Sequence, residues 1–63
     1  MELTNLERRI LEALKEEGRA SAPMIAEKVG TTPATVRTAL VRLTKLGLVR
    51  RVYRGIYEPV EGA

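Results

Sequence analysis

Apolar residues recur every three or four positions near the start of the chain. These positions are Leu6, Ile10, Leu11 and Leu14. Such spacing places them on one face of a helix, so we predict a helix over residues 5–17. Thr4 and Glu7 have the spacing of a capping box, which favours a helix start at this point. Gly18 is suited to the left-handed conformation that often ends a helix.

Two further helical segments each begin with a hydroxyl residue followed closely by proline. Ser21 and Thr32 are suited to capping, and a proline in the first turn loses no hydrogen bond. We therefore predict helices over residues 22–29 and 33–46, the second closed by Gly47. We expect Met24 to lie in the core.

The second half of the chain changes from a helical to a strand pattern after Gly47. Residues 48–53 and 56–60 are rich in Val, Ile and Tyr, and Arg54-Gly55 between them is suited to a turn. We predict a β-hairpin. In the register that we expect, Val52 lies opposite Tyr57 and Arg51 opposite Glu58. Tyr53 and Tyr57 are expected to be half-buried residues of this hairpin rather than platforms for stacked bases.

The predicted helix over residues 33–46 sorts its residues around its axis. Val36, Ala39, Leu40 and Leu43 lie on the side expected to face the core. Ala34, Thr38, Val41 and Lys45 lie on the opposite side, with Thr35 and Arg42 on one flank and Arg37 and Thr44 on the other. Val41 is the one large apolar residue on the outer side. It either contacts a thymine methyl group or is one of the isolated apolar residues that protein surfaces commonly carry.

Positive charge is concentrated in the second half of the chain. Residues 31–57 hold six Lys or Arg and no acid, whereas residues 1–30 hold six glutamates against five Lys or Arg. The net charge of +3 hides this asymmetry. A one-sided basic surface is typical of proteins that bind a polyanion, although a solvated basic face without a partner has the same composition.

The composition argues against several classes of function. The chain has no Cys, no His and no Asp, and it has one Ser. The usual thiolate and imidazole metal ligands and the usual nucleophilic triads are therefore missing, and we expect no enzyme activity, no metal site and no cofactor. No apolar run reaches the roughly 20 residues of a membrane span. No signal-peptide pattern is present, which favours a cytoplasmic, nucleoid-associated setting.

The sequence resembles, from about Thr4 to Val60, the winged helix-turn-helix superfamily of DNA-binding domains, of the type found in small prokaryotic transcriptional regulators. The residues that carry the resemblance are 32–37, Leu40, Leu43, 46–51 and 54–57. The fold that it implies is α+β and mostly α, with three helices and a C-terminal two-stranded β-hairpin as the wing. We expect one such domain over residues 1–63.

The resemblance implies that the helix over residues 33–46 enters the major groove and that the wing, residues 48–60, lies beside it. Arg37 is the best candidate for a guanine contact, and Arg54 at the wing turn for a minor-groove or backbone contact. Arg50 and Arg51 point to opposite faces of their strand, so we expect only one of them to contact DNA. The candidate DNA-binding residues are Thr32, Ala34, Thr35, Arg37, Thr38, Arg42, Lys45, Arg50, Arg51 and Arg54.

These observations predict sequence-specific binding of double-stranded DNA by a small transcriptional regulator, repressor-like, that acts by occupying its site. A homodimer is compatible with the sequence, and no small-molecule effector is evident. The alternative is a protein–protein adaptor that uses the same fold without reading DNA. An adaptor is expected to carry apolar or acidic residues on the outer side of the third helix, where this chain carries mainly Thr, Arg and Lys. Single-stranded or RNA binding is expected to need more aromatic residues than two tyrosines.

Overall fold

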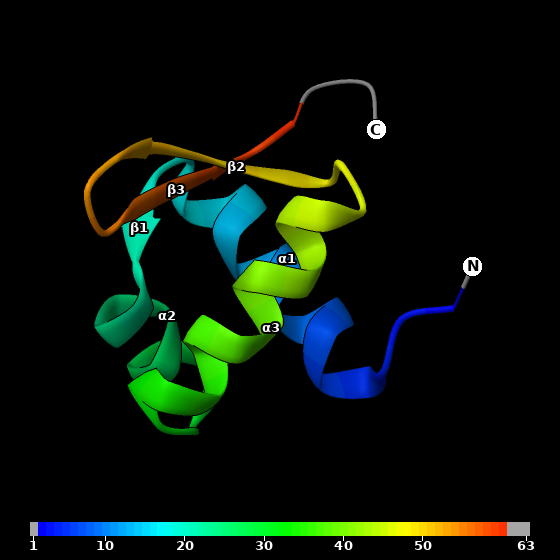
Figure 1. Ribbon diagram of the computed structural model, residues 1–63. Helices are drawn as coiled ribbons and strands as arrows, with labels where there is room; N and C mark the ends of the chain where they lie inside the picture. The colour runs from blue at the N-terminus through cyan, green and yellow to red at the C-terminus, as the bar shows by residue number, and fades with distance from the viewer. Residues whose placement is uncertain (1, 61–63) are drawn as a thin grey trace.

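The computed structural model describes residues 2–60, in which three helices and a three-stranded antiparallel sheet follow one another (Figure 1). The elements are α1 (Asn5–Glu17), β1 (Ala20–Ser21), α2 (Ala22–Val29), α3 (Pro33–Lys45), β2 (Val49–Tyr53) and β3 (Ile56–Pro59). The three predicted helices and the predicted hairpin are confirmed, with ends that differ by at most one residue. The single domain over residues 1–63 stays a prediction, because residues 1 and 61–63 lie outside the described part.

Each helix begins at the side-chain cap that the sequence predicted. The Thr4 hydroxyl accepts the backbone N–H of Glu7 at 3.1 Å, and the Glu7 carboxylate accepts the backbone N–H of Thr4 at 2.9 Å. Ser21 and Thr32 cap α2 and α3 in the same way, each accepting the N–H three residues ahead. Gly30 ends α2 with a φ of 88°, a conformation that costs glycine little. Local chemistry therefore fixes where α2 stops and α3 starts.

One hydrophobic core joins the helices to the sheet. Its fully buried side chains are Ile10, Leu14, Ile25, Val36, Leu40, Leu43 and Val49. The predicted inner side of α3 is therefore confirmed. The prediction for Met24 is wrong, since its side chain is 51% exposed. The buried positions of α2 are Ala22, Ile25 and Ala26, and the helical spacing of these three leaves Met24 on the outer side.

The sheet contains a third strand that the sequence analysis did not predict. β1 pairs antiparallel with β3, and the strand order is β1-β3-β2 (Figure 1). Two residues are too few to show the alternation by which a strand is recognised in a sequence. β1 lies in the connection between α1 and α2, so this connection is hydrogen-bonded to β3, one of the two strands of the wing.

The predicted register of the hairpin is wrong by one residue. Arg50 lies opposite Glu58, and Arg51 lies opposite Tyr57. The cause is an irregularity between Arg51 and Tyr53, where β2 holds one residue more than its partner strand. Because side chains alternate along a strand, this shift changes which wing residues share a face.

An ion pair joins the start of α1 to the second half of α3. Nη1 of Arg42 donates to both carboxylate oxygens of Glu7, at 2.7 and 2.8 Å, and the Glu7 side chain is only 8% exposed. The hydrogen bond from the backbone of Thr4 is the largest influence on the pKa of Glu7 and lowers it. Burial acts in the opposite direction, and Arg42 lowers this pKa further. The net result is a pKa below the ordinary value of 4.5. The carboxylate therefore stays charged although it is buried.

Replacing Leu40 by Ala is expected to destabilise the fold by about 2–5 kcal/mol, because it removes a fully buried side chain and leaves a cavity. A domain of this size has only a few kcal/mol of stability to lose, so much of the variant should be unfolded. The matched control is Val41→Ala, one residue along α3 and 53% exposed. It should stay within about 0.5 kcal/mol of the wild type. Urea unfolding followed by circular dichroism measures both, and equal losses would contradict the assignment of the buried side.

Glu7→Gln should make the fold less sensitive to acid. The folded-state pKa of Glu7 is lowered, so the unfolded state takes up its proton first as the pH falls. The stability that this glutamate contributes is therefore present above about pH 4.5 and is lost as the pH falls below it. Glutamine keeps the capping box but cannot titrate.

The measurement is the urea midpoint from about pH 7 to about pH 3. Glu7→Gln should begin less stable, because Arg42 loses its charged partner, and should then lose less stability with acid. Glu12→Gln is the matched control, an exposed residue of the same helix without an ion pair within residues 2–60. If Glu7→Gln follows the wild-type slope, the ion pair is not the source of the acid sensitivity.

Candidate nucleic-acid interface

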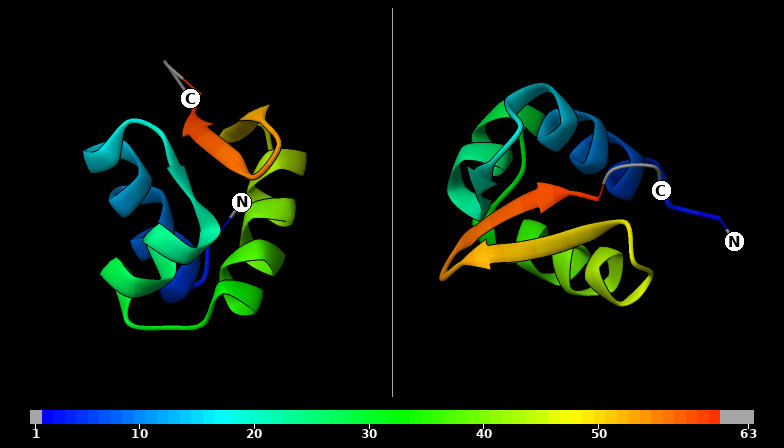
Figure 2. Two further views of the ribbon diagram at one scale, coloured as in Figure 1. Left: turned by 90° about the vertical axis from the view of Figure 1, so that its left-hand side faces the viewer. Right: turned by 90° about the horizontal axis from the view of Figure 1, so that it is seen from above.

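The outer side of α3 is not covered by any other described element. The two views in Figure 2, together with Figure 1, place α3 at one edge of the helix bundle with the hairpin beside its C-terminal half. Burial of Val36, Leu40 and Leu43 fixes the rotation of α3 about its axis. The exposed residues of this helix and its cap include all those that the sequence analysis selected here, namely Thr32, Ala34, Thr35, Arg37, Thr38, Arg42 and Lys45.

The threonine hydroxyls in the first half of α3 are already hydrogen-bonded within the helix. Thr35 and Thr32 share a hydrogen bond of 2.9 Å between their hydroxyls. The Thr38 hydroxyl donates to the backbone carbonyl of Ala34 at 3.2 Å. A hydroxyl has a single hydrogen to donate. Thr38 therefore has no donor left for a phosphate or for a base acceptor.

The six cations of the basic half fall into two groups. Arg42 is paired with Glu7, and Arg50 is paired with Glu58. The other four have no ion pair within residues 2–60, and they are Arg37, Lys45, Arg51 and Arg54. All four are exposed. The unneutralised charge of this half of the chain therefore lies on α3 and on the wing.

One face of the wing carries a cluster of charges around Glu58. Arg19 and Arg50 donate to its two carboxylate oxygens through their Nε atoms, at 2.9 and 2.6 Å. These hydrogen bonds, that from Arg19 first, hold the pKa of Glu58 below its ordinary value of 4.5. The Arg19 guanidinium also lies 5.6 Å from the centre of the Tyr53 ring, within the range of a cation–π contact. Arg51 is thus not the partner of Glu58.

The sequence analysis missed Arg19 because it missed β1. Arg19 directly precedes β1, and only the pairing of that strand with β3 brings the residue to the wing. The expectation that Tyr53 is half-buried is also wrong, since its side chain is exposed beside Arg19. Tyr57, in contrast, packs against the core as expected.

A hollow of about 370 Å³ lies between the second half of α3 and the other face of the wing. Its lining residues are Val41, Thr44, Lys45, Arg51 and Tyr57. Lys45, Arg51 and the hydroxyl of Tyr57 are groups of the kind that bind phosphate oxygens in proteins, whereas the hydroxyl of Thr44 already donates to the carbonyl of Leu40 at 2.7 Å. Tyr57 was not among the predicted DNA-binding residues. The correct register, which places Tyr57 opposite Arg51, would have indicated it.

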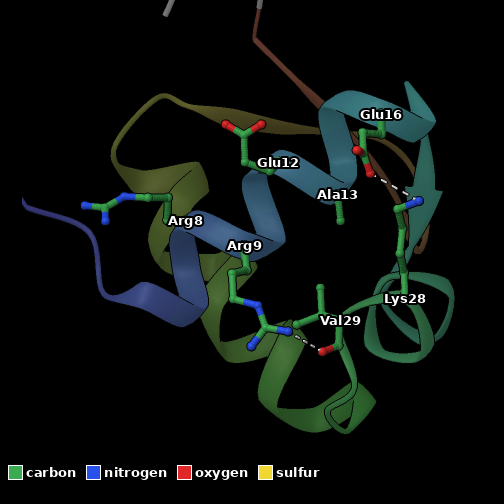
Figure 3. A pocket seen from close by; sticks show the side chains of 7 residues that line it. All are labelled: Arg8, Arg9, Glu12, Ala13, Glu16, Lys28 and Val29. Atoms are coloured by element: carbon green, nitrogen blue, oxygen red, sulfur yellow. Dashed lines mark hydrogen bonds and ion pairs between the residues drawn. The ribbon is translucent and has the colours of Figure 1, made fainter.

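A second hollow lies between α1 and the end of α2 and has a different character (Figure 3). Its lining residues are Arg8, Arg9, Glu12, Ala13, Glu16, Lys28 and Val29. Nζ of Lys28 lies 3.2 Å from Glu16, and Arg9 donates to the carbonyl of Val29 at 2.9 Å. Two glutamates stand against its three cations, so it offers a polyanion little net attraction.

Residues 2–60 contain neither a candidate membrane span nor a candidate metal site. None of the helices there is both long enough and apolar enough to cross a membrane. No three residues of the His, Cys, Asp or Glu types come together there in a group able to hold a metal ion.

Two curated relatives resemble this chain in sequence. One is an uncharacterised HTH-type transcriptional regulator of Pyrococcus horikoshii, 37% identical over 51 residues, which are 81% of this chain and 32% of the relative. The other is the HTH-type transcriptional regulator AldR of Mycolicibacterium smegmatis, 36% identical over 55 residues, with 87% and 32% covered. The chain thus spans about a third of the length of the curated relatives it matches.

A solved structure and a family model agree with this fold. The structure of Lactococcus lactis ZitR in complex with DNA matches with a TM-score of 0.84 and 28% sequence identity, covering 98% of this chain and 46% of that one. The family described as winged helix-turn-helix DNA-binding matches residues 3–50, most of the chain. The chain described here therefore belongs to the winged helix-turn-helix DNA-binding family.

Proposed function

We propose that this chain binds double-stranded DNA sequence-specifically and serves as the DNA-binding part of a transcriptional regulator that acts by occupying its site. The observation that carries the proposal is the position of the four cations without ion pairs, which lie on the uncovered side of α3 and on the wing beside it. Membership of the winged helix-turn-helix DNA-binding family supports it. The names of the two relatives support the regulatory role.

The dimensions of α3 suit the major groove. Thirteen residues form a rod about 20 Å long, and a groove about 12 Å wide accepts a single helix. In this arrangement Arg37, in the first half of α3, donates two hydrogen bonds to a guanine edge. Lys45 and Arg51 meet a phosphate at the hollow between helix and wing, and Arg54 at the wing turn meets the backbone or the minor groove.

Arg42 and Arg50 have a different role in this proposal from the one that the sequence suggested. Each is held by a glutamate that is mostly buried, and a phosphate would have to compete with that partner. We assign them to holding α3 and the wing in place. Arg51 is then the one of the two adjacent wing arginines that contacts DNA.

Two copies on one DNA site are the arrangement that the size of the chain favours. The Cα atoms span 26 × 25 × 19 Å, less than one turn of DNA, which is about 34 Å. One copy therefore covers only a few base pairs, and two half-sites raise both affinity and specificity. The adaptor alternative is less well supported, because the outer side of α3 shows Thr, Arg and Lys and only one large apolar residue.

Binding to a mixed-sequence duplex should weaken steeply as salt rises, because each neutralised phosphate releases a counterion. Arg54→Ala should reduce the slope of log K against log salt by about 0.9, the contribution of one phosphate contact. The matched control is Arg8→Ala, which removes the same charge from the hollow of α1 and α2. It should leave the slope unchanged.

Fluorescence anisotropy with a labelled 20-base-pair duplex, between about 50 and 200 mM salt, measures these slopes. Equal slopes for both variants would contradict the role of the wing turn. A wild-type protein that does not bind at the lower salt would refute the proposed function.

A further inference from the structure

We infer that α3 recognises thymine through a line of methyl groups formed by Ala34, Thr38 and Val41, which we call the methyl stripe. The inference rests on the proposed DNA-binding function and names the base edge that the helix reads. It concerns the outer side of α3 from Ala34 to Val41, where none of the three residues is charged; Lys45 follows them on the same side.

The three residues of the methyl stripe lie in line along the helix. They are spaced by four and three positions, and residues at this spacing are neighbours on one helix face. All three are exposed, and Val41 keeps 53% of its surface accessible. Leu40 and Leu43, on either side of Val41 in the sequence, are fully buried. The packing of α3 therefore turns the stripe away from the core.

The hydrogen bond of Thr38 removes this residue as a donor toward a ligand, although its oxygen can still accept. Its hydroxyl donates back to the carbonyl of Ala34, so its one hydrogen is used inside the helix. The methyl group remains as the part of the side chain able to make an apolar contact. The Thr35 hydroxyl beside it shares a hydrogen bond with the Thr32 hydroxyl. No residue of the methyl stripe can donate a hydrogen bond outward.

The chemistry of the base edges then selects thymine. In the major groove, guanine presents two acceptors, adenine an acceptor and a donor, and cytosine a donor. Thymine presents an acceptor and, alone among the four bases, an apolar group, its C5-methyl. A donor or acceptor of a base pressed against the methyl groups of Ala34 and Val41 loses its water without gaining a partner, whereas the C5-methyl of thymine gains an apolar contact there. The methyl stripe therefore favours thymine, and Arg37 on its flank is the group that favours an adjacent guanine.

The surroundings of Val41 distinguish it from an isolated surface residue. Val41 borders the hollow that also contains Lys45 and Arg51, the two cations best placed for a DNA phosphate. Met24 is exposed to a similar extent, 51%, but its neighbours in a hollow on α2 are Glu17, Glu27 and Lys28. Positive charge brings DNA to Val41, whereas the acidic surroundings of Met24 repel it. Met24 therefore provides a matched control.

The test replaces thymine by deoxyuridine, which removes the C5-methyl and keeps every hydrogen-bonding group. A duplex library with a randomised 16-base-pair centre is first enriched on the wild-type protein. The enriched duplex is then made with thymidine or with deoxyuridine at each position in turn, and binding to wild type, Val41→Ala and Met24→Ala is measured by anisotropy. Circular dichroism verifies that both variants are folded.

For the wild type and Met24→Ala, we expect deoxyuridine to weaken binding about fourfold at each contacted thymine. This factor corresponds to the free energy of burying one methyl-sized group. For Val41→Ala, the thymine that faces position 41 should show no such loss. An enriched duplex that the wild type binds equally well in both forms would overturn the methyl stripe while leaving the proposed function intact. A library that yields no enriched sequence, although the unselected duplex binds, would overturn sequence-specific recognition and the methyl stripe with it. Failure to bind any duplex would overturn the proposed function itself.

Discussion

The burial of one side of α3 is the constraint on which the rest of the structure depends. Val36, Leu40 and Leu43 of this helix are fully buried, and they pack with residues from α1, α2 and β2. A chain of this length buries only about 60% of its unfolded surface, so no other part of the core can replace them. The same contacts fix how α3 is rotated. The face that is offered to a partner is therefore a consequence of how the core is packed.

Features that depend on neighbouring residues were predictable from the sequence, whereas those that depend on distant contacts were not. Thr4, Ser21 and Thr32 act within one turn, so the helix starts were predicted correctly. β1 exists only because β3 pairs with it, and the extra residue of β2 is visible only beside its partner strand. The exposed residues proposed for DNA contact were found from helical periodicity, but their pairing with glutamates was not, because those glutamates are 35 and 8 residues away.

Ion pairs decide how much of the basic charge is available to a ligand. A count along the sequence gives six cations in the second half, and the structure neutralises two of them with Glu7 and Glu58. Both pairs also have a mechanical effect, since one ties α3 to α1 and the other ties β2 to β3. Of the remaining cations, Arg37 lies beside the uncharged stripe on α3, Lys45 lies at its C-terminal end, and the others lie on the wing. Charges around the stripe and methyl groups within it form a surface suited to attract the DNA backbone and to read base edges between its phosphates.

The most direct test of this account is the mapping of backbone amide chemical shifts while an unlabelled mixed-sequence duplex is added to the isotope-labelled protein. The account predicts that the largest changes lie in the first turns of α3, at Lys45 and around Arg51 and Arg54. The hollow between α1 and α2 should change little, because two glutamates offset most of the positive charge of its three cations. Changes centred on that hollow, with α3 unaffected, would contradict the claim that the uncovered side of α3 and the wing form the DNA-binding surface.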